Sequence, residues 1–345
     1  MKTKVQIARF LKKFWKKATA AGLAAVLAAV FLAGCGSTAG NASKTVNIGI
    51  QPSAAAIPIL VAKEKGWLSS ALKKQGVTVK WNNFEAGPPM NESMASGKTD
   101  IGFLGDVPAV SAIGAGQKNV LIATSAEGPN AYDILVSKSS PIQSVKDLKG
   151  KTVGTTVGST AQNVLEQLLK KYGLSSKDVK IVNINAGDAA TVLTENQADA
   201  VVFWEPTPTR LVDSGVARII AKAGDANQLC VNPITAREAY VNANADVVTT
   251  VIKQYARGVK AIKDGDLDAK TTKAIAKYLS VQPEQVKKIT NHYNYTVVTK
   301  QKDIDSLQDV VGFLVRTGGL KKSYSVKDVV TNKYVKKANI AQYLK

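Results

Sequence analysis

The sharpest chemical signal in this chain of 345 residues is Gly158-Ser159-Thr160, which directly precedes an apolar-periodic segment expected to be a helix. Glycine lets a ligand approach the backbone, and the two hydroxyls can donate hydrogen bonds beside the unpaired amides of a first helical turn. Such a helix start binds an anion without a basic side chain. The alternative is an ordinary cap, in which Ser159 or Thr160 bonds its own helix and stabilises it by about 1 kcal/mol.

Two further loops carry acids and an aromatic residue. Asp106 and Glu205 are each followed closely by proline, and Trp204 directly precedes Glu205. The acids could recognise an amine or exclude unsuitable anions. They could equally cap helices, because acids favour helix N-termini. Trp204 could line a pocket or fill the core.

The remaining chemistry-bearing residue types are scarce. His292 is the single histidine, and Cys230 and Cys35 are the two cysteines. No CxxC, HExxH or GxxxxGK[ST] motif is present, so the usual signatures of metal, redox and nucleotide sites are missing. We interpret His292 as a hydrogen-bonding residue and Cys230 as a small buried apolar residue. The sequence therefore predicts neither an enzyme nor a metal or cofactor site.

Alternating strands and helices must position these loops. Expected strands cover 46–50, 77–81, 101–104, 151–154, 179–184 and 200–203, and helical patterns lie between them. This order indicates βαβ units and mainly parallel sheets. Ligands in such sheets lie beyond the carboxyl ends of the strands. Five loops should meet there, namely 51–55, 85–89, 105–108, 157–162 and 204–207.

Two segments share one plan. Residues 100–108 and 199–206 each read as an aspartate, an apolar strand, an acid and a proline. The match is short, and it suits two related α/β lobes that end a strand at one interface. After about residue 236 the pattern changes to amphipathic helices, expected at 246–264, 268–279, 283–291 and 303–316.

The N-terminus has the features of an export signal. Seven basic and no acidic residues precede Cys35, and an apolar run ends in Leu32-Ala33-Gly34. The run is too short for a transmembrane helix of about 20 residues. With Cys35 next, the signal resembles a bacterial lipoprotein lipobox. The resemblance implies cleavage after residue 34, lipid on Cys35 and an extracytoplasmic, membrane-anchored protein. Small polar residues suit a tether over 35–44, and the long lysine-rich signal favours a Gram-positive surface over a periplasm.

The basic charge does not indicate nucleic acid. Removal of residues 1–34 lowers the formal charge from +20 to +13. The remaining lysines are scattered, with pairs such as Lys73-Lys74 and Lys321-Lys322 that suit solvated surfaces. Attraction to an anionic wall or lipid surface is the expected consequence. Nothing in the sequence indicates an obligate oligomer, so we expect a monomer.

Several motifs together resemble one family, the solute-binding proteins of nitrate/sulfonate/taurine-type ABC importers, and within it the aliphatic sulfonate binders. The motifs are Phe84-Glu85-Ala86-Gly87-Pro88-Pro89-Met90, Gly105-Asp106-Val107-Pro108, the Gly158-Ser159-Thr160 helix start and Phe203-Trp204-Glu205-Pro206. The resemblance implies an α/β type II periplasmic-binding-protein fold with a cleft between two lobes and a helical C-terminal segment. Lobe I would comprise 45–131 plus 230–345, and lobe II 132–229. The partners would be a small solute and ABC permease subunits.

The resemblance also implies a ligand site. Ser53, Gly87, Ser159 and Thr160 would hold a sulfonate, and Trp204 would line its organic tail. The full set of expected ligand-binding residues is Gln51, Ser53, Gly87, Pro88, Asp106, Ser159, Thr160, Trp204 and Glu205.

Other functions are compatible with the same residues. Taurine, nitrate or an aminopyrimidine thiamine precursor are alternative solutes. Nitrate would demand a cationic cleft, and the predicted cleft loops contain no Lys or Arg, the nearest being Arg210. A wall-binding surface lipoprotein and an enzyme are more distant alternatives. The enzyme would need histidine and cysteine chemistry that His292 and Cys230 do not supply.

Overall fold

The computed structural model describes residues 44–344, with the side chain of Leu344 left out. The signal segment, Cys35 and nearly all of the expected tether lie outside the described residues. Within the described range, no helix combines the length and the apolar character needed to cross a membrane.

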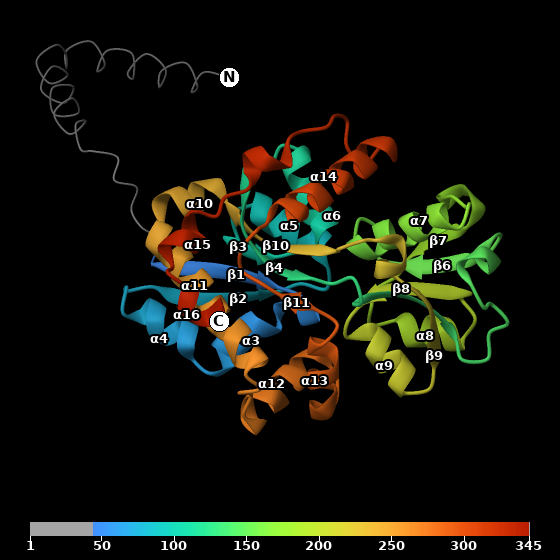
Figure 1. The fold of residues 1–345 in the computed structure, drawn as a ribbon, viewed down its shortest axis with the longest axis horizontal. Helices are drawn as coiled ribbons and strands as arrows, with labels where there is room; N and C mark the ends of the chain where they lie inside the picture. The colour runs from blue at the N-terminus through green and yellow to red at the C-terminus, as the bar shows by residue number, and fades with distance from the viewer. Residues whose placement is uncertain (1–43, 345) are drawn as a thin grey trace, which may run out of the picture. The chain divides into compact units, whose positions relative to one another are not determined.

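Two sheets form the framework (Figure 1). The larger sheet, which we call sheet A, has six strands in the order β11-β4-β10-β3-β1-β2. Their bounds are β1 Thr45–Ile50, β2 Thr78–Asn83, β3 Ile101–Phe103, β4 Asn119–Glu127, β10 Val231–Arg237 and β11 Asn294–Tyr295.

The smaller sheet, sheet B, has five strands in the order β7-β6-β8-β5-β9. Their bounds are β5 Tyr132–Ser137, β6 Thr152–Thr155, β7 Lys180–Asn183, β8 Ala200–Trp204 and β9 Ala217–Lys222. We refer to each sheet with the elements packed on it as the sheet A half and the sheet B half.

Helices cover both faces of each sheet (Figure 1). On sheet A, α5, α6 and α14 enclose one apolar cluster, and α3, α4 and α11 pack on the opposite face. On sheet B, α7 lies on one face and α8 and α9 on the other. The helix bounds are α3 Ile57–Glu64, α4 Trp67–Lys73, α5 Gly87–Ala95, α6 Asp106–Gly114, α7 Thr160–Lys171, α8 Ala189–Thr194, α9 Thr207–Asp213, α10 Glu238–Ala243, α11 Ala245–Lys263, α12 Ala269–Leu279, α13 Pro283–Thr290, α14 Gln301–Arg316, α15 Lys333–Lys337 and α16 Ala341–Leu344.

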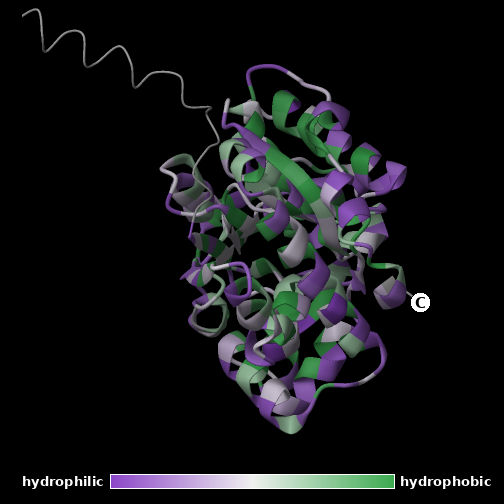
Figure 2. Cartoon of the chain, turned by 90° about the vertical axis from the view of Figure 1, so that its left-hand side faces the viewer, coloured by the Kyte–Doolittle hydropathy of each residue, from purple (hydrophilic) through white to green (hydrophobic). Residues whose placement is uncertain are grey.

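Hydrophobic residues follow the strands and the inward helix faces, while hydrophilic residues gather on the outer helices (Figure 2). Helix α7 illustrates the local reason. Its apolar positions Val164, Leu165, Leu168 and Leu169 recur at helical spacing, and all four are fully buried. A stripe of this kind directs one face of the helix toward the core. The four C-terminal helices predicted from the same pattern agree with α11 to α14 within two residues.

The expectation of mainly parallel sheets was wrong, because both sheets are mixed. β1 pairs in parallel with β2 and β3, and β6 in parallel with β7 and β8. β10 and β5 run antiparallel to both of their neighbours. The reason is topological. β4 and β9 each lead directly to a strand in the other sheet, so the returning strands enter against the βαβ direction.

Two adjacent connections join the halves. Residues 128–131 link β4 to β5, and residues 223–230 link β9 to β10. They are bonded to each other, since the Gly128 amide donates to Leu229 O over 2.9 Å and the Gly224 amide to Pro129 O over 2.8 Å. The halves are therefore connected by a pair of mutually braced crossings.

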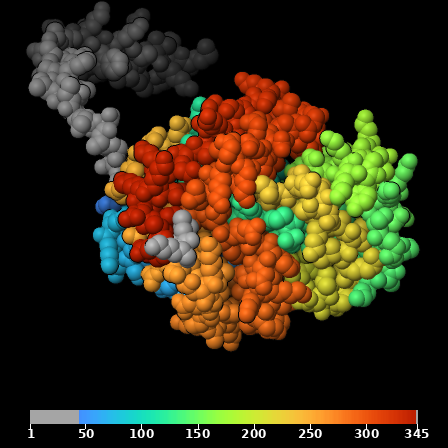
Figure 3. Space-filling model, in the orientation of Figure 1, coloured from blue at the N-terminus to red at the C-terminus, as the bar shows by residue number. Residues whose placement is uncertain are grey.

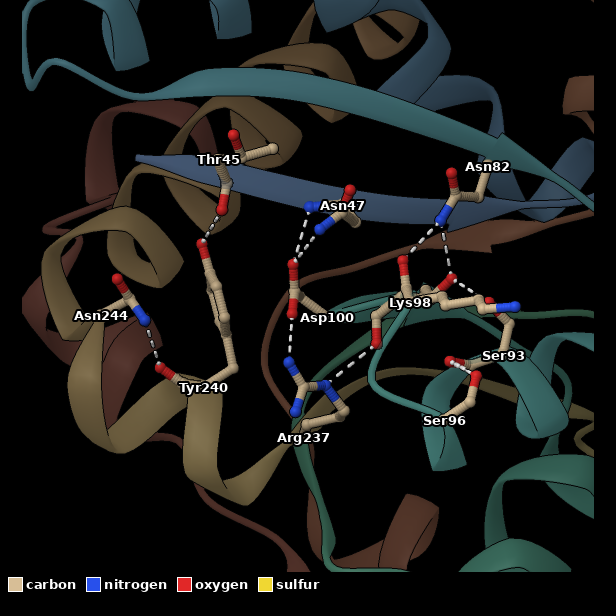
Figure 4. Close-up of polar contacts among 11 residues, drawn as sticks. Thr45, Asn47, Asn82, Ser93, Ser96, Lys98, Asp100, Arg237, Tyr240 and Asn244 are labelled. Atoms are coloured by element: carbon tan, nitrogen blue, oxygen red, sulfur yellow. Dashed lines mark hydrogen bonds and ion pairs between the residues drawn. The ribbon is translucent and has the colours of Figure 1, made fainter. Parts of the chain in front are cut away.

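The repeated plan seen in the sequence has a common structural role. Asp100 precedes β3, and its carboxylate accepts the backbone N–H of Asn47 over 2.8 Å. Asp199 precedes β8, and its carboxylate accepts the backbone N–H of Thr152 over 2.8 Å. Figure 4 shows the first of these contacts, together with the ion pair between Asp100 and the guanidinium of Arg237. Each aspartate thus fixes one parallel strand pair near its start, β1–β3 and β6–β8 respectively.

Candidate functional site

The five predicted loops meet between the two halves. The Ala54 amide donates to Glu205 O over 3.0 Å, and Trp204 Nε1 donates to Pro52 O over 3.2 Å. At the first turns of α7 and α6, Thr160 Oγ1 donates to Asp106 Oδ1 over 2.6 Å. These contacts connect loop 51–55 to loop 204–207 and loop 105–108 to loop 157–162. The rule that polar loops converge at the carboxyl ends of strands therefore holds for this chain.

Ser53 and Ser159 both occupy cap positions, which the alternative interpretation anticipated for Ser159 only. Ser53 Oγ accepts the Ala55 amide over 3.3 Å at a short 3₁₀ turn, Ala54–Ala56. Ser159 Oγ accepts the Gln162 amide over 3.4 Å at the start of α7. A hydroxyl that accepts from its own backbone still has one O–H to donate. Capping and anion binding are therefore compatible at both serines.

Thr160 uses its hydroxyl differently. Its O–H is donated to Asp106, whose Oδ1 also accepts the Val107 amide over 2.6 Å. Burial raises the pKa of Asp106 to about 6, although both hydrogen bonds act in the opposite direction. Gly105 makes this approach possible, because a Cβ there would lie 2.3 Å from Thr160 Oγ1. The contact therefore depends on glycine at position 105.

Glu205 is buried between three donors. Its carboxylate accepts the Thr209 hydroxyl over 2.8 Å and the Thr209 amide over 3.3 Å, which satisfies part of the first turn of α9. His292 Nδ1 lies 2.7 Å from Glu205 Oε1. The interpretation of His292 as a hydrogen-bonding residue is confirmed. Because His292 belongs to the sheet A half and Glu205 to the sheet B half, this contact also joins the two halves.

Trp204 is almost fully buried, and its N–H is engaged by Pro52 O. Its ring meets Phe203 edge to face at a centroid separation of 5.8 Å. An indole held in this way presents its ring surface, and not its donor, to the space around it.

The first two loops supply the remaining predicted residues. Gly87 begins α5 and packs on α6, since a Cβ there would lie 2.4 Å from Pro108 Cγ. Pro88 faces Gly158, where a Cβ would lie 3.5 Å from Pro88 Cγ. Gln51 is buried, and its Oε1 atom has no hydrogen-bond partner among the described residues.

Two tyrosines were missed in the sequence. Tyr132 begins β5, and its hydroxyl donates to Asn232 Oδ1 over 3.2 Å. Tyr293 is buried, and its hydroxyl lies near Ser53 and Tyr132 outside ordinary hydrogen-bond geometry. Desolvation raises the pKa of both phenols. Tyr293 follows His292 directly, but nothing in its local pattern separates it from a core tyrosine. Cys230 is buried and free, as predicted.

The space beside these contacts contains an arginine. A cavity of about 240 Å³ is lined by Pro52 and Glu85 from one half and by Pro206, Thr207 and Arg210 from the other. The structure thus corrects the argument that the cleft lacks a basic residue. Position 210 lies outside the predicted loops, yet one turn of α9 brings its side chain to the same space. The absence of cationic groups therefore no longer counts against a nitrate site.

No group of three or more His, Cys, Asp or Glu side chains suited to a metal ion occurs within the described range. The donors gathered at the loops are hydroxyls, amides and one guanidinium, and they suit an anion.

Comparison with known proteins shows the family to which the chain belongs. A family model described as "NMT1/THI5 like" matches residues 53–265. A Bacillus subtilis (strain 168) protein named "Putative aliphatic sulfonates-binding protein" is 32% identical over 323 residues, which cover 92% of this chain and 96% of that protein. The "Taurine-binding periplasmic protein" of Escherichia coli (strain K12) is 28% identical over 176 residues, about half of each chain.

A solved structure agrees with these relatives. The alkanesulfonate-binding protein SsuA from Xanthomonas axonopodis pv. citri, bound to MOPS, superposes with a TM-score of 0.77 at 25% identity, covering 84% of this chain and 99% of that one. The predicted two-lobed α/β binding-protein fold is confirmed. The relatives named here are binding proteins, which confirms the prediction that the chain is not an enzyme. This chain therefore belongs to the NMT1/THI5-like family and is a solute-binding protein of the sulfonate/nitrate/taurine ABC importer type.

Proposed function

We propose that this protein binds an aliphatic sulfonate outside the cytoplasm and delivers it to the permease of an ABC importer. The observation that supports it best is the pair of capping serines, Ser53 and Ser159, one from each half. Each accepts from its own backbone and keeps an O–H to donate. A sulfonate is fully ionised and offers three acceptor oxygens. Neutral donors suit it because they satisfy the charge without a second buried ion.

The lobes would follow the two sheets. Lobe I would comprise 45–131 plus 230–345, and lobe II 132–229. Both crossings near 128–131 and 223–230 would act as the hinge. Closure around a solute is the ordinary motion of two domains joined in this way. The contacts Thr160–Asp106, Trp204–Pro52 and His292–Glu205 would then form as the lobes close.

The predicted site residues would divide into three groups. Ser53, Ser159 and the backbone at Gly87 would contact the sulfonate, and Trp204, Pro88 and Gln51 would border the organic tail. Asp106, Thr160 and Glu205 would hold the closed arrangement. This division departs from the sequence prediction for Thr160, because its O–H is already donated to Asp106.

Cys35 would carry the membrane anchor. A diacylglyceryl group supplies two chains, which suffices for stable anchoring. The test is fractionation of cells that produce the 345-residue chain or its Cys35→Ser variant, with metabolic labelling by a fatty acid. We expect the protein with Cys35 to incorporate the label and to fractionate with membranes. The Cys35→Ser variant should do neither. A labelled serine variant would refute lipidation at this residue.

A thermal-shift panel tests the solute. It contains alkanesulfonates, taurine, nitrate, sulfate and aminopyrimidines. A solute at about 100 times its dissociation constant adds roughly 2.7 kcal/mol to the free energy of unfolding, which raises the midpoint by several degrees. We expect a shift with alkanesulfonates. A shift confined to nitrate, taurine or aminopyrimidines would replace the sulfonate with that solute, and wall polymer binding that salt abolishes would favour a surface adhesin.

A further inference from the structure

The cavity at Arg210 lies between the halves and adjoins the proposed sulfonate site. It is lined by Pro52 and Pro206, the direct neighbours of Ser53 and Glu205. Asn185, after β7, and Glu85, after β2, lie at its other sides. All four positions follow the carboxyl end of a strand, so the cavity continues the edge where the solute is expected. At about 240 Å³ it is smaller than most ligand pockets, which span about 300–1,000 Å³. It suits a small group rather than a whole ligand.

Arg210 enters this cavity without an acidic partner. Its side chain is half-buried, and Nη2 donates to Ala186 O over 3.1 Å. None of the ion pairs in the described chain involves it. Desolvation lowers the pKa of Arg210, which marks a guanidinium removed from water without compensation by an anion. A guanidinium has five N–H donors in a planar fork that matches a carboxylate, so donors remain after the bond to Ala186.

Two acids also line the cavity. Glu85 and Asp188 are both exposed, so water screens their charges. Arg210 is the less solvated group and has the most to gain from a counter-ion. The acids would favour a ligand that also carries an ammonium group, and would disfavour one with several negative charges at the same end.

We propose that the solute has two polar ends, and that Arg210 binds a carboxylate at the end opposite the sulfonate. This inference rests on the proposed function and narrows its substrate class to carboxylated small sulfonates, with or without an amino group. The carboxylate would lie in the Arg210 cavity while the sulfonate is held near Ser53 and Ser159.

The test compares solutes that differ by a carboxylate. One pair is propane-1-sulfonate and 3-sulfopropanoate, and the other is taurine and 2-amino-3-sulfopropanoate. Calorimetric titration uses the wild-type chain, the variants Arg210→Gln and Arg210→Lys, and the control variant Arg218→Gln. Arg218 lies in the same half and also donates to backbone carbonyls, those of Ser140 and Ile142, but it does not line the cavity. Thermal midpoints establish that each variant is folded.

We expect the wild type to prefer the carboxylated member of at least one pair by about tenfold or more, since charge-assisted hydrogen bonds are the strong ones. Arg210→Gln should abolish this preference and leave the affinity for the other member within about threefold. Arg210→Lys should keep part of the preference, and Arg218→Gln all of it.

Two outcomes would overturn the inference alone. Either the wild type shows no preference within either pair, or Arg210→Gln weakens both members equally, in which case Arg210 binds the sulfonate itself or supports closure. Binding of nitrate or an aminopyrimidine with no response to any sulfonate would instead refute the proposed function, and this inference with it.

Discussion

Thr160 Oγ1 and Asp106 Oδ1 lie 2.6 Å apart and join the first turns of α7 and α6 across the two halves. Both residues are almost fully buried. Two α/β halves that share two crossings can separate only if contacts of this kind break. We therefore expect these contacts to determine closure and, through closure, binding.

Removal of the Thr160 hydroxyl should weaken solute binding. Thr160→Val removes one of the two hydrogen bonds that Asp106 Oδ1 accepts, and the loss of a hydrogen bond at a buried acceptor costs about 1–3 kcal/mol. If closure is required for binding, affinity falls roughly 5- to 150-fold. Thr194→Val is the matched control, because that exposed threonine bonds only within α8. Equal affinities for the two variants in a calorimetric titration would show that the contact does not contribute.

The stability contributed by Asp106 should depend on pH. Burial raises its pKa from 3.8 to about 6, so the native state binds this proton more tightly than the unfolded chain. The stabilisation is complete below about pH 4 and is lost as pH rises to about 6. Two pKa units correspond to on the order of 3 kcal/mol.

Asp106→Asn provides the reference for that measurement. Urea unfolding at pH 4 and at pH 7.5 should show the wild type losing stability relative to the variant by that amount. Asp133, a second buried carboxyl whose pKa is raised by desolvation, is present in both proteins and cancels. A difference between the two proteins that stays constant over this range would contradict the assignment.

A methyl group at position 105 should keep the halves apart. A Cβ there would lie 2.3 Å from Thr160 Oγ1, a separation that real Cβ atoms do not show. Gly105→Ala should therefore lower solute affinity by at least tenfold while each half stays folded. Gly312→Ala is the control, since its new Cβ would meet only the flexible guanidinium of Arg316 at 3.3 Å. Small-angle scattering would report the opening directly, and an unchanged profile with unchanged affinity would rule it out.

His292 should be coupled energetically to Glu205. His292→Ala removes one donor from a carboxylate that is 1% exposed, and the expected loss is about 1–3 kcal/mol in the free energy of unfolding. Glu205→Gln and the double variant complete a cycle that isolates the pair. A coupling energy near zero would show that the 2.7 Å contact is incidental. Solute affinity measured on the same proteins would separate closure from stability.

The C-terminal segment contributes a further part of the boundary between the halves. Figure 3 shows residues near 280–290 in contact with the sheet B half on this face. Gln285 Nε2 and Lys288 Nζ both reach the carboxylate of Asp213, over 2.7 and 2.5 Å. These are exposed contacts of small individual value. Their presence shows that the late helices, whose role the sequence left open, take part in how the two halves meet.

The sequence by itself determined six of the strands in the described range, the main helices and the group of loops at the strands' carboxyl ends, whereas β4, β5, β9, β10 and β11 were not predicted. Apolar alternation and helical spacing are local properties, and the positions of β1, β3, β6, β8 and α11 to α14 follow from them. The two aspartates before the strands, Asp100 and Asp199, were also recognised from the sequence, because the pattern that follows each of them is repeated. The family motifs at these loops predicted the class of protein, because each motif is a short, local stretch of sequence.

Only the tertiary structure decided which polar side chains are available to bind a solute. Thr160, Trp204 and Glu205 all had suitable chemistry, but their polar atoms are engaged across the halves by Asp106, Pro52 and His292. These partners lie 54, 152 and 87 residues away in sequence, beyond any local pattern. The antiparallel strand pairs and the position of Arg210 beside the cavity also depend on contacts between segments far apart in the sequence. Pairing between distant segments is set by the summed packing of the whole chain, and no short stretch records it.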